Sequence, residues 1–221
     1  FEPAGSINLS STTLDVSPNY LLNYGTVFGS GTATHSLHLY RDAVSKALVF
    51  SAGTVDYVWG LDSNHDFNGI MSTPDMGDQT DVNLQQATVN LFADMGVQPG
   101  TLQPGLVPAS ASTVTTPPTS VITAPAGGKN FLTGNPLTIT GTATAAGGGV
   151  VAAVDVSVDG GNSWHAATVP SVSANATWSF AWTPAVPGSI TIMSRAVDDS
   201  GNLETPSAGV TVSVITQGFT I

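Results

Sequence analysis

The sequence predicts a mainly β protein, with a C-terminal β-sandwich and an N-terminal, incomplete α/β segment that contains one clear helix. The first observation is composition: 28 Thr and 23 Ser among 221 residues, with only 9% charged residues, are typical of a β-rich extracellular chain. The second is a series of seven short β-prone runs after residue 119, divided by turn residues. The third is a run with helical periodicity at residues 81–95.

Two strands are expected before the helix. Residues 34–41 alternate apolar and polar side chains, and residues 47–52 form a short apolar run closed by Gly53, which fits a buried strand. A strand this apolar is normally covered on both faces, as in parallel sheets. Since one helix covers only part of one face, we expect residues 1–106 to pack against another polypeptide.

The helix is expected at residues 81–95. Asp78 or Asp81 can serve as its N-cap, and Gly96 stands where a glycine commonly ends a helix. The residues that share one face are Leu84, Ala87, Thr88, Leu91, Phe92 and Met95. Of these we expect Leu84, Leu91 and Phe92 to be buried.

A stretch rich in Pro, Ser and Thr divides the chain. It has no hydrophobic period and therefore predicts an extended linker at residues 107–119, between a domain at 1–106 and a domain at 120–221. Charge differs across this stretch: residues 1–107 hold 10 acids and 2 bases, and residues 108–221 hold 5 acids and 2 bases.

The second half reads as an immunoglobulin-like sandwich. Seven strands in about 100 residues, with Trp178 and Trp182 available for the core, are typical of that fold. The expected strands are residues 120–124, 137–144, 152–158, 164–169, 176–182, 189–196 and 209–215. Because Trp178, Phe180 and Trp182 alternate on one strand, we expect all three to face the core.

The run from Ser157 to Trp164 matches the Asp-box pattern S-x-D-x-G-x-T-W, with Ser163 in place of Thr. Physically this pattern is the tip of a β-hairpin. Asp159 can accept hydrogen bonds from the turn, glycines supply positive φ, and Trp164 packs beneath. We therefore expect a structural turn without a catalytic role.

Three stretches of the second half carry a resemblance. Residues 154–164, 178–182 and 192–201 resemble the Ig-like dimerisation domain of sulfite-oxidase-type molybdenum enzymes, and also the bacterial Ig modules of large secreted proteins. The resemblance covers residues 120–215. It implies a sandwich that spaces or joins other domains.

The first half resembles a different family. Residues 1–5, 31–41, 47–54, 59–62 and 85–96 look like the final segment of the domain named after the large subunit of N,N-dimethylformamidase, which is similar to class I glutamine amidotransferases. This resemblance covers residues 1–106. It implies that most of the parallel sheet lies upstream, in a long secreted bacterial protein that continues into Ig-like modules.

Catalytic residues of these families cannot be matched here. The chain has no cysteine nucleophile, and Thr54 follows Gly53 where an amidotransferase histidine would be expected. His35 and His38 face opposite sides of a strand, so we expect surface or packing roles. The resemblance implies iron held by Tyr and Glu ligands, but none of the candidates matches those positions. The candidates are Tyr20, Tyr24, Tyr40, Tyr57 and Glu2.

An acidic loop is the remaining candidate site. It places carboxylate or amide oxygens at alternate positions, as calcium loops do. The candidate ligands are Asp62, Asn64, Asp66 and Asn68. Phe67 stands where an EF-hand loop needs glycine, so an acidic loop rich in Asx turns is the first interpretation and a calcium site is the alternative. No cofactor other than this calcium candidate is indicated.

Composition excludes several functions. Four cations cannot form the basic stripe that nucleic acids or anionic membranes require, and no apolar run reaches the roughly 20 residues needed for membrane insertion. We expect a non-catalytic scaffolding or binding segment of a secreted or surface bacterial protein. One alternative is part of a dimethylformamidase-like amidohydrolase whose active-site residues lie mostly upstream. The other is a carbohydrate-binding sandwich. The expected partner is the upstream part of the precursor or a second copy.

Overall fold

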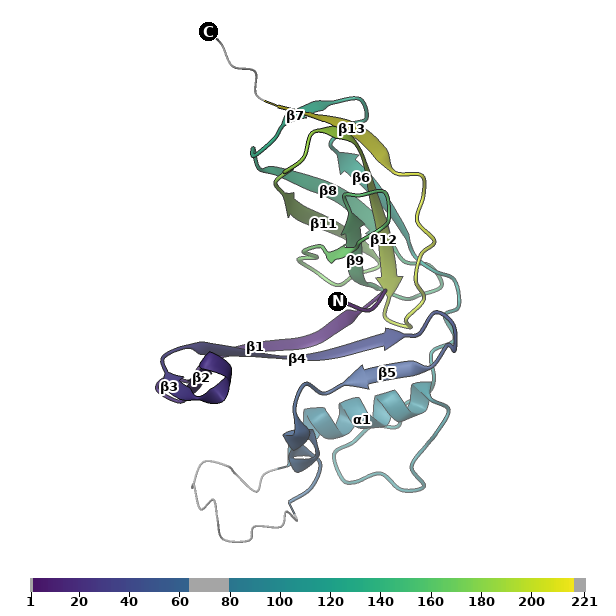
Figure 1. Ribbon diagram of the computed structural model, residues 1–221. Coiled ribbons are helices and arrows are strands. Elements are labelled where there is room, and N and C mark those ends of the chain that lie inside the picture. Colours follow the sequence, from purple (N-terminus) through teal and green to yellow (C-terminus); the bar gives the residue numbers. More distant parts are fainter. Residues whose placement is uncertain (1, 64–79, 217–221) are drawn as a thin grey trace. The chain divides into compact units, whose positions relative to one another are not determined.

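Figure 1 shows the computed structural model of the chain, in which residues 2–63 and 80–216 are described. The chain forms two compact units. The sandwich unit comprises Phe1–Leu9, His38–Phe50 and Val114–Ile221, and the helix unit comprises Ser10–Leu37 and Ser51–Thr113. The described residues contain thirteen strands and one α-helix, which confirms the prediction of a mainly β fold. The predicted domain boundaries stay a prediction, because packing alone does not show which segment folds by itself.

Two sheets make the sandwich (Figure 1). The larger has the strand order β10-β9-β12-β13-β7 and the smaller has the order β11-β8-β6. Neighbouring strands are antiparallel, except that β13 and β7 are parallel. The strands are β6 (Thr119–Ala124), β7 (Asn130–Leu132), β8 (Leu137–Thr144), β9 (Val151–Ser157), β10 (His165–Ala166), β11 (Asn175–Trp182), β12 (Gly188–Asp198) and β13 (Val210–Ile215).

All seven strands predicted for this half are present. The run at 164–169 is reduced to two residues in β10, because the residues around it form the hairpin turn and loop. Strand β7 was not predicted, since three residues between turn residues are too few to show a period of two. It lies at the edge of the larger sheet, beside β13.

The core of the sandwich is apolar and comes from both sheets. Its buried residues are Ile139, Ala143, Val151, Val154, Val156, Ala176, Trp178, Ile192, Ala196 and Val212. Trp178 is 2% exposed, whereas Phe180 and Trp182 are half-buried and pack against this cluster. The prediction that the aromatic residues of β11 face the core is therefore confirmed for Trp178, whereas Phe180 and Trp182 are only partly buried.

Gly141 provides the space that the Trp178 ring occupies. The two residues are direct partners across β8 and β11, and the Trp178 indole Nε1 donates to the Thr142 carbonyl oxygen at 3.1 Å. A Cβ atom on residue 141 would collide with the indole and with the carbonyl oxygen of Val121. A glycine inside a strand usually costs stability, but here it allows close packing.

A third sheet has the order β1-β4-β5. Its strands are β1 (Ile7–Asp15), β4 (Thr32–Arg41) and β5 (Leu48–Ser51), and a separate hairpin pairs β2 (Tyr20–Leu22) with β3 (Val27–Gly29). Strand β1 was not predicted, because its Ser/Thr-rich sequence lacks an apolar alternation; all of its residues except Ile7 are exposed. The three apolar residues of β5 are half-buried and Ser51 is exposed, so β5 is not the fully buried strand that its composition predicts.

Helix α1 (Val82–Asp94) is confirmed with its predicted caps. The Asp81 side chain accepts a hydrogen bond from the Asn83 amide at 2.7 Å, and Gly96 adopts a φ of 77° just after the helix. The preceding 3-10 segment η2 (Val55–Gly60) contacts this helix.

The predicted buried face of α1 is wrong. The buried side chains are Gln85, Val89 and Ala93, whereas Leu84 and Leu91 are half-buried and Phe92 is 43% exposed. The reason is that the chain after the helix folds back along it: Gln85 donates to Gln103 at 3.1 Å, and the amide of Val107 donates to Gln86 at 2.8 Å. This cover is irregular in structure and leaves no periodic signal in the sequence.

We predict that Trp178→Ala lowers the free energy of unfolding of the sandwich by about 3–5 kcal/mol, because it opens a large cavity in a fully buried site. Urea unfolding followed by far-UV circular dichroism measures the loss. Val186→Ala, which truncates a 69% exposed side chain of the sandwich, is the control and should change little. A loss below about 1 kcal/mol for Trp178→Ala would contradict the core assignment.

We also predict that Gly141→Ala is destabilising by about 1–3 kcal/mol, although alanine suits strands better than glycine, because the added methyl group overpacks the site. Gly100→Ala is the matched control, since a Cβ atom there would meet open space. Equal melting temperatures for the two variants would show that Trp178 can move away from residue 141.

Candidate functional site

Arg195 is the central charged residue of the sandwich. It lies on β12, and its Nη2 and Nε atoms are 2.8 and 2.9 Å from Asp155 Oδ2 on β9. The guanidinium also lies 4.1 Å above the centroid of the Trp164 ring. Both partners of the ion pair are largely buried, at 12% and 9% exposure. The arrangement joins two strands and covers one face of the ring by a cation–π contact.

The Asp-box hairpin adopts the predicted turn. Asp159 Oδ1 accepts hydrogen bonds from the Ser157 hydroxyl at 2.7 Å and from the Ser163 amide at 2.9 Å. Gly160 and Gly161 have φ values of 71° and 93°, which confirms the expected role of the glycines. The Trp164 indole Nε1 donates to the Gly161 carbonyl oxygen at 3.1 Å and closes the turn.

These contacts change the titration of Asp159. Partial burial acts to raise its pKa, but hydrogen bonds from the hydroxyl and amide of Ser163, and then from Ser157, outweigh it and lower the pKa from 3.8 to about 2. The carboxylate therefore stays ionised at all physiological pH values. Its function in this structure is to accept hydrogen bonds from the turn.

The other acids of the second half also bond within the sandwich. Glu204 Oε1 and Oε2 accept from the amides of Ser120 at 2.9 Å and Ala196 at 2.8 Å. Asp198 accepts from the Ser200 and Asn202 amides, and Asp199 accepts from the Val150 amide at 3.0 Å. With Asp155 and Asp159, all five acids of residues 108–221 thus accept hydrogen bonds from the domain's own groups.

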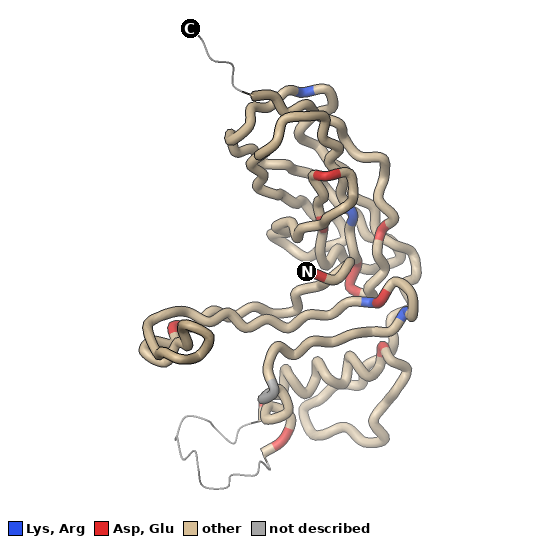
Figure 2. The backbone as a smooth tube through the Cα atoms, in the orientation of Figure 1, with Lys and Arg blue, Asp and Glu red and all other residues tan. Residues whose placement is uncertain are grey.

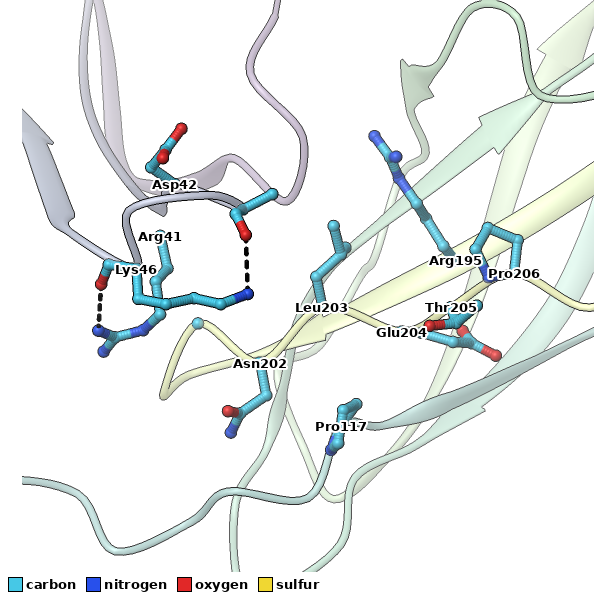
Figure 3. Close-up of a pocket in the computed structure, with 12 residues that line it drawn as sticks. Arg41, Asp42, Lys46, Pro117, Arg195, Asn202, Leu203, Glu204, Thr205 and Pro206 are labelled. Atoms are coloured by element: carbon cyan, nitrogen blue, oxygen red, sulfur yellow. Dashed lines mark hydrogen bonds between the residues drawn. The ribbon is translucent and has the colours of Figure 1, made fainter.

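A cavity of about 420 Å³ lies within the sandwich unit (Figure 3). Its walls come from the end of β4 and the loop that joins β4 to β5, from the segment before β6, from β12, and from the segment that follows β12. The lining residues are Arg41, Asp42, Ala43, Lys46, Pro117, Arg195, Gly201, Asn202, Leu203, Glu204, Thr205 and Pro206. We name it the basic cavity, because three of the four Lys and Arg residues of the whole chain line it.

Charged residues are few along the chain (Figure 2), and two of the cations at the basic cavity bind backbone carbonyl groups. Arg41 Nη1 donates to the Lys46 carbonyl oxygen at 3.1 Å, and Arg41 Nη2 donates to the Ser200 carbonyl oxygen at 3.3 Å. Lys46 Nζ donates to the Ala43 carbonyl oxygen at 2.8 Å. Within residues 2–63 and 80–216, neither cation forms an ion pair with a carboxylate.

The β4–β5 loop holds these cations in place. Asp42 N donates to the Ala47 carbonyl oxygen at 2.9 Å, and Lys46 N donates to the Asp42 carbonyl oxygen at 3.0 Å. Hydrogen bonds from the amide and hydroxyl of Ser45 lower the pKa of Asp42. Lys46 has a φ of 61°, in the left-handed region that favours glycine.

The predicted calcium ligands are only partly within the described residues. Asp62 is described and exposed, whereas Asn64, Asp66 and Asn68 lie outside the described residues. The calcium hypothesis therefore stays a prediction. In the described ranges, His, Asp and Glu side chains form no group of three arranged to hold a metal.

The two strand histidines bond to different neighbours. His35 Nε2 lies 2.7 Å from the Ala52 carbonyl oxygen, and His38 Nδ1 lies 3.2 Å from the Ser6 hydroxyl. The structure thus gives each ring its own partner. Tyr57, one of the tyrosines considered for iron, shares a 3.0 Å hydrogen bond with the Thr88 hydroxyl of α1, and Tyr24 is fully exposed.

Comparison with protein families identifies the second half. Residues 118–212 match the model of the family described as bacterial Ig domain. This segment carries a bacterial Ig-like domain. The resemblance of residues 1–106 to the dimethylformamidase domain has no support in the comparisons and stays a prediction. No curated protein matches the chain.

Solved structures similar to the chain include the following three, each of which covers less than half of this chain. The fibronectin(III)-like modules of CbhA from Clostridium thermocellum are 23% identical, with coverage of 43% of this chain and 94% of that chain and a TM-score of 0.33. The PKD domain of an M14-like peptidase from a Thermoplasmatales archaeon is 18% identical, with coverage of 48% and 100% and a TM-score of 0.37. Domains 4 and 5 of the S-layer protein SbsC are 18% identical, with coverage of 49% and 57% and a TM-score of 0.30.

The basic cavity was not predicted from the sequence. Arg195 is about 150 residues from Arg41 and Lys46, and the three residues belong to no motif. No local signal in the sequence connects them, because they come from segments that meet only in the folded structure. The described part of the chain also contains no helix that could span a membrane, since α1 has 13 residues.

We predict that Asp159→Asn removes part of the acid sensitivity of the sandwich. Because the folded pKa of about 2 lies below the ordinary 3.8, the ionised carboxylate stabilises the fold fully above about pH 4, and this contribution is lost as the pH falls to about 2. Melting temperatures measured from pH 6 to pH 2 should fall more steeply for the wild type than for the variant. Parallel curves over this window would contradict the role of Asp159.

Proposed function

We propose that the chain is a non-catalytic scaffolding or binding segment of a secreted or surface bacterial protein. The observation that carries this proposal is the match of residues 118–212 to the bacterial Ig domain family. The five acids of the Ig-like half are consistent with it, because each accepts hydrogen bonds that hold the domain's own strands and turns. The Ser/Thr-rich, cation-poor composition and the bacterial Ig match support export to the cell surface or medium.

We further propose that residues 1–106 pack against another polypeptide, either the upstream part of the precursor or a second copy. Fifteen of the nineteen exposed large apolar side chains in the described ranges precede residue 108. They are Leu9, Leu14, Leu21, Leu22, Tyr24, Val27, Phe28, Val44, Val58, Trp59, Val82, Phe92, Met95, Val97 and Val107. Exposed apolar surface on this scale is typical of an interface.

The buried residues support the same proposal. Of the buried apolar side chains in the described ranges, Ile7, Leu37, Val89 and Ala93 precede residue 108, whereas twelve follow it. About a hundred residues with so small a core do not gain enough from burial to offset the conformational entropy of folding. A partner that covers β5 and the outer face of α1 would supply the missing burial.

The alternative, that the chain is part of an enzyme, rests on the same small core in residues 1–106. If residues 1–106 complete a dimethylformamidase-like domain, the chain should co-purify with an upstream polypeptide, and metal analysis of that complex should find iron. A scaffolding segment gives a metal-free complex with the same interface. The two proposals therefore differ in the metal content of the complex.

The carbohydrate-binding alternative needs an exposed aromatic platform on the sandwich. Trp178 is 2% exposed, and Arg195 covers one face of the half-buried Trp164 ring. Trp182 packs against the core. These positions favour a structural role for the three tryptophans over a sugar-stacking one.

We predict that the chain alone associates through its first half. Leu21 and Phe28 are cross-strand partners on the β2–β3 hairpin and are 56% and 69% exposed. The double variant Leu21→Ser/Phe28→Ser should reduce the concentration-dependent rise in molar mass measured by light scattering. Val121→Ser/Val186→Ser, with side chains that are 59% and 69% exposed in the sandwich, is the matched control.

The control double variant should associate like the wild type. Equal association of all three proteins would contradict the interface proposal, and a monodisperse wild-type monomer at every concentration would contradict it as well.

A further inference from the structure

We propose that two copies of this chain pair edge to edge through strand β1, with the two strands antiparallel and Thr12 of one copy opposite Thr12 of the other. This inference rests on the packing proposed above and deepens it, because it names a second copy as the partner and the Ser10–Leu14 segment of β1 as the contact. That segment lies wholly within the helix unit. Pairing would extend the sheet of each copy into that of the other by main-chain hydrogen bonds.

The outer edge of β1 is available for such a contact. The order β1-β4-β5 puts β1 at the end of its sheet, and Ser10–Leu14 are all exposed. On the inner side, Thr13 Oγ1 lies 2.8 Å from Thr34 Oγ1 of β4. In the described part of the chain, the backbone of Ser10–Leu14 forms hydrogen bonds with β4 alone. The other row of amide and carbonyl groups can therefore pair with another strand.

The edges of the sandwich in the same chain are each protected. Strands β7 and β10 have only three and two residues, and β6 has a register shift between Ile122 and Ala124. Strand β11 is covered near its middle, where Thr168 and Ser179 exchange two backbone hydrogen bonds of 2.8 and 3.0 Å. Short, bulged or covered edges are the usual means by which proteins prevent association. Strand β1 has nine residues, and its Ser10–Leu14 segment contains no proline and no charge.

Charge favours a second copy at this edge over other parts of the surface. The chain has a formal net charge of −11, so two copies repel wherever their acids come close. Asp15 is the one charged residue of β1. When Thr12 lies opposite its own copy, the two Asp15 residues are about 20 Å apart, which exceeds the Debye length of about 8 Å at physiological salt. Parallel pairing in register would place them side by side.

The side chains of the segment also suit pairing with themselves. Antiparallel pairing about Thr12 places Ser11 of one copy opposite Thr13 of the other. Opposed serine and threonine side chains can share hydrogen bonds across two strands, as Thr13 and Thr34 already do within the sheet. A symmetric contact of this kind uses the β1 edge of both copies and leaves none for a third. It therefore predicts a dimer and not a fibre.

Cysteine cross-linking tests the pairing on the full chain, which contains no cysteine of its own. Thr12→Cys should form a disulfide-linked dimer under mild oxidation, because opposed residues lie within the roughly 7 Å that a disulfide spans between Cα atoms. Ser10→Cys alone and Leu14→Cys alone should not, since each residue lies four positions along the strand, about 13 Å, from its own copy. A mixture of these two variants should cross-link, because Ser10 lies opposite Leu14 of the other copy.

Thr177→Cys is the matched control for cross-linking. Thr177 is likewise an exposed threonine on an edge strand, β11, but it lies in the sandwich. Its dimer yield on a non-reducing gel, confirmed by intact mass, gives the background from random collision. We expect the yield of Thr12→Cys to exceed this background several-fold.

Thr12→Lys gives a second measurement that needs no oxidation. It places two lysines opposite each other in the dimer, so the dissociation constant from sedimentation equilibrium should rise by about fivefold or more. Thr177→Lys adds the same charge elsewhere and should leave the dissociation constant unchanged or lower it, since it reduces the net negative charge of the chain. Both side chains are exposed, so both variants should keep the melting temperature of the wild type.

Three results would overturn the β1 pairing: equal yields for Thr12→Cys and Thr177→Cys, a yield for Ser10→Cys alone that equals that of its mixture with Leu14→Cys, or an unchanged dissociation constant for Thr12→Lys. The packing proposed for the first half would survive any of these, provided that the wild type still associates. A wild type that is monomeric at every concentration would contradict both proposals.

Discussion

The packing of the Trp178 indole against the backbone of Gly141 is the contact on which the sandwich depends. The largest fully buried side chain occupies the space that a Cβ atom on residue 141 of β8 would fill. With this core in place, the charged residues of the Ig-like half are free to fix its turns and edges. Arg195 joins β12 to β9, Glu204 joins the segment after β12 to β6, and Asp159 forms the hairpin tip. Packing drives the fold, and electrostatics determine its surface geometry.

The features that the sequence predicted correctly, in the Ig-like half and at the helix cap, depend on local information. Alternation along β11, the cap at Asp81 and the Asp-box at 157–164 each follow from residues within one turn or strand. The errors have a common cause, since they depend on segments distant in sequence. Helix α1 buries Gln85, and not Phe92, because residues after the helix fold back on it. The basic cavity escaped prediction for the same reason: its cations come together only when the β4–β5 loop lies beside β12 and the chain that follows it.

The two halves differ in how much apolar surface they bury. The Ig-like half has a continuous apolar core, while the first half carries most of the exposed apolar side chains of the described ranges. A chain of this kind is suited to linking two parts of a larger protein. The Ig-like half is stabilised by its own core, and the first half is stabilised by contact with a partner. The proposed scaffolding role follows from this asymmetry.

Amide hydrogen exchange on the isolated full-length chain tests the central claim most directly. The account predicts strong protection in β9, β12 and β8, whose residues form the core, and much faster exchange in β5 and α1, most of whose apolar side chains are exposed or only partly buried. Exchange should slow in β5 and α1 when the partner is bound. Protection in Leu48–Ser51 and Val82–Asp94 equal to that of β9, in a monodisperse monomer, would show that the first half is self-sufficient and would contradict the account.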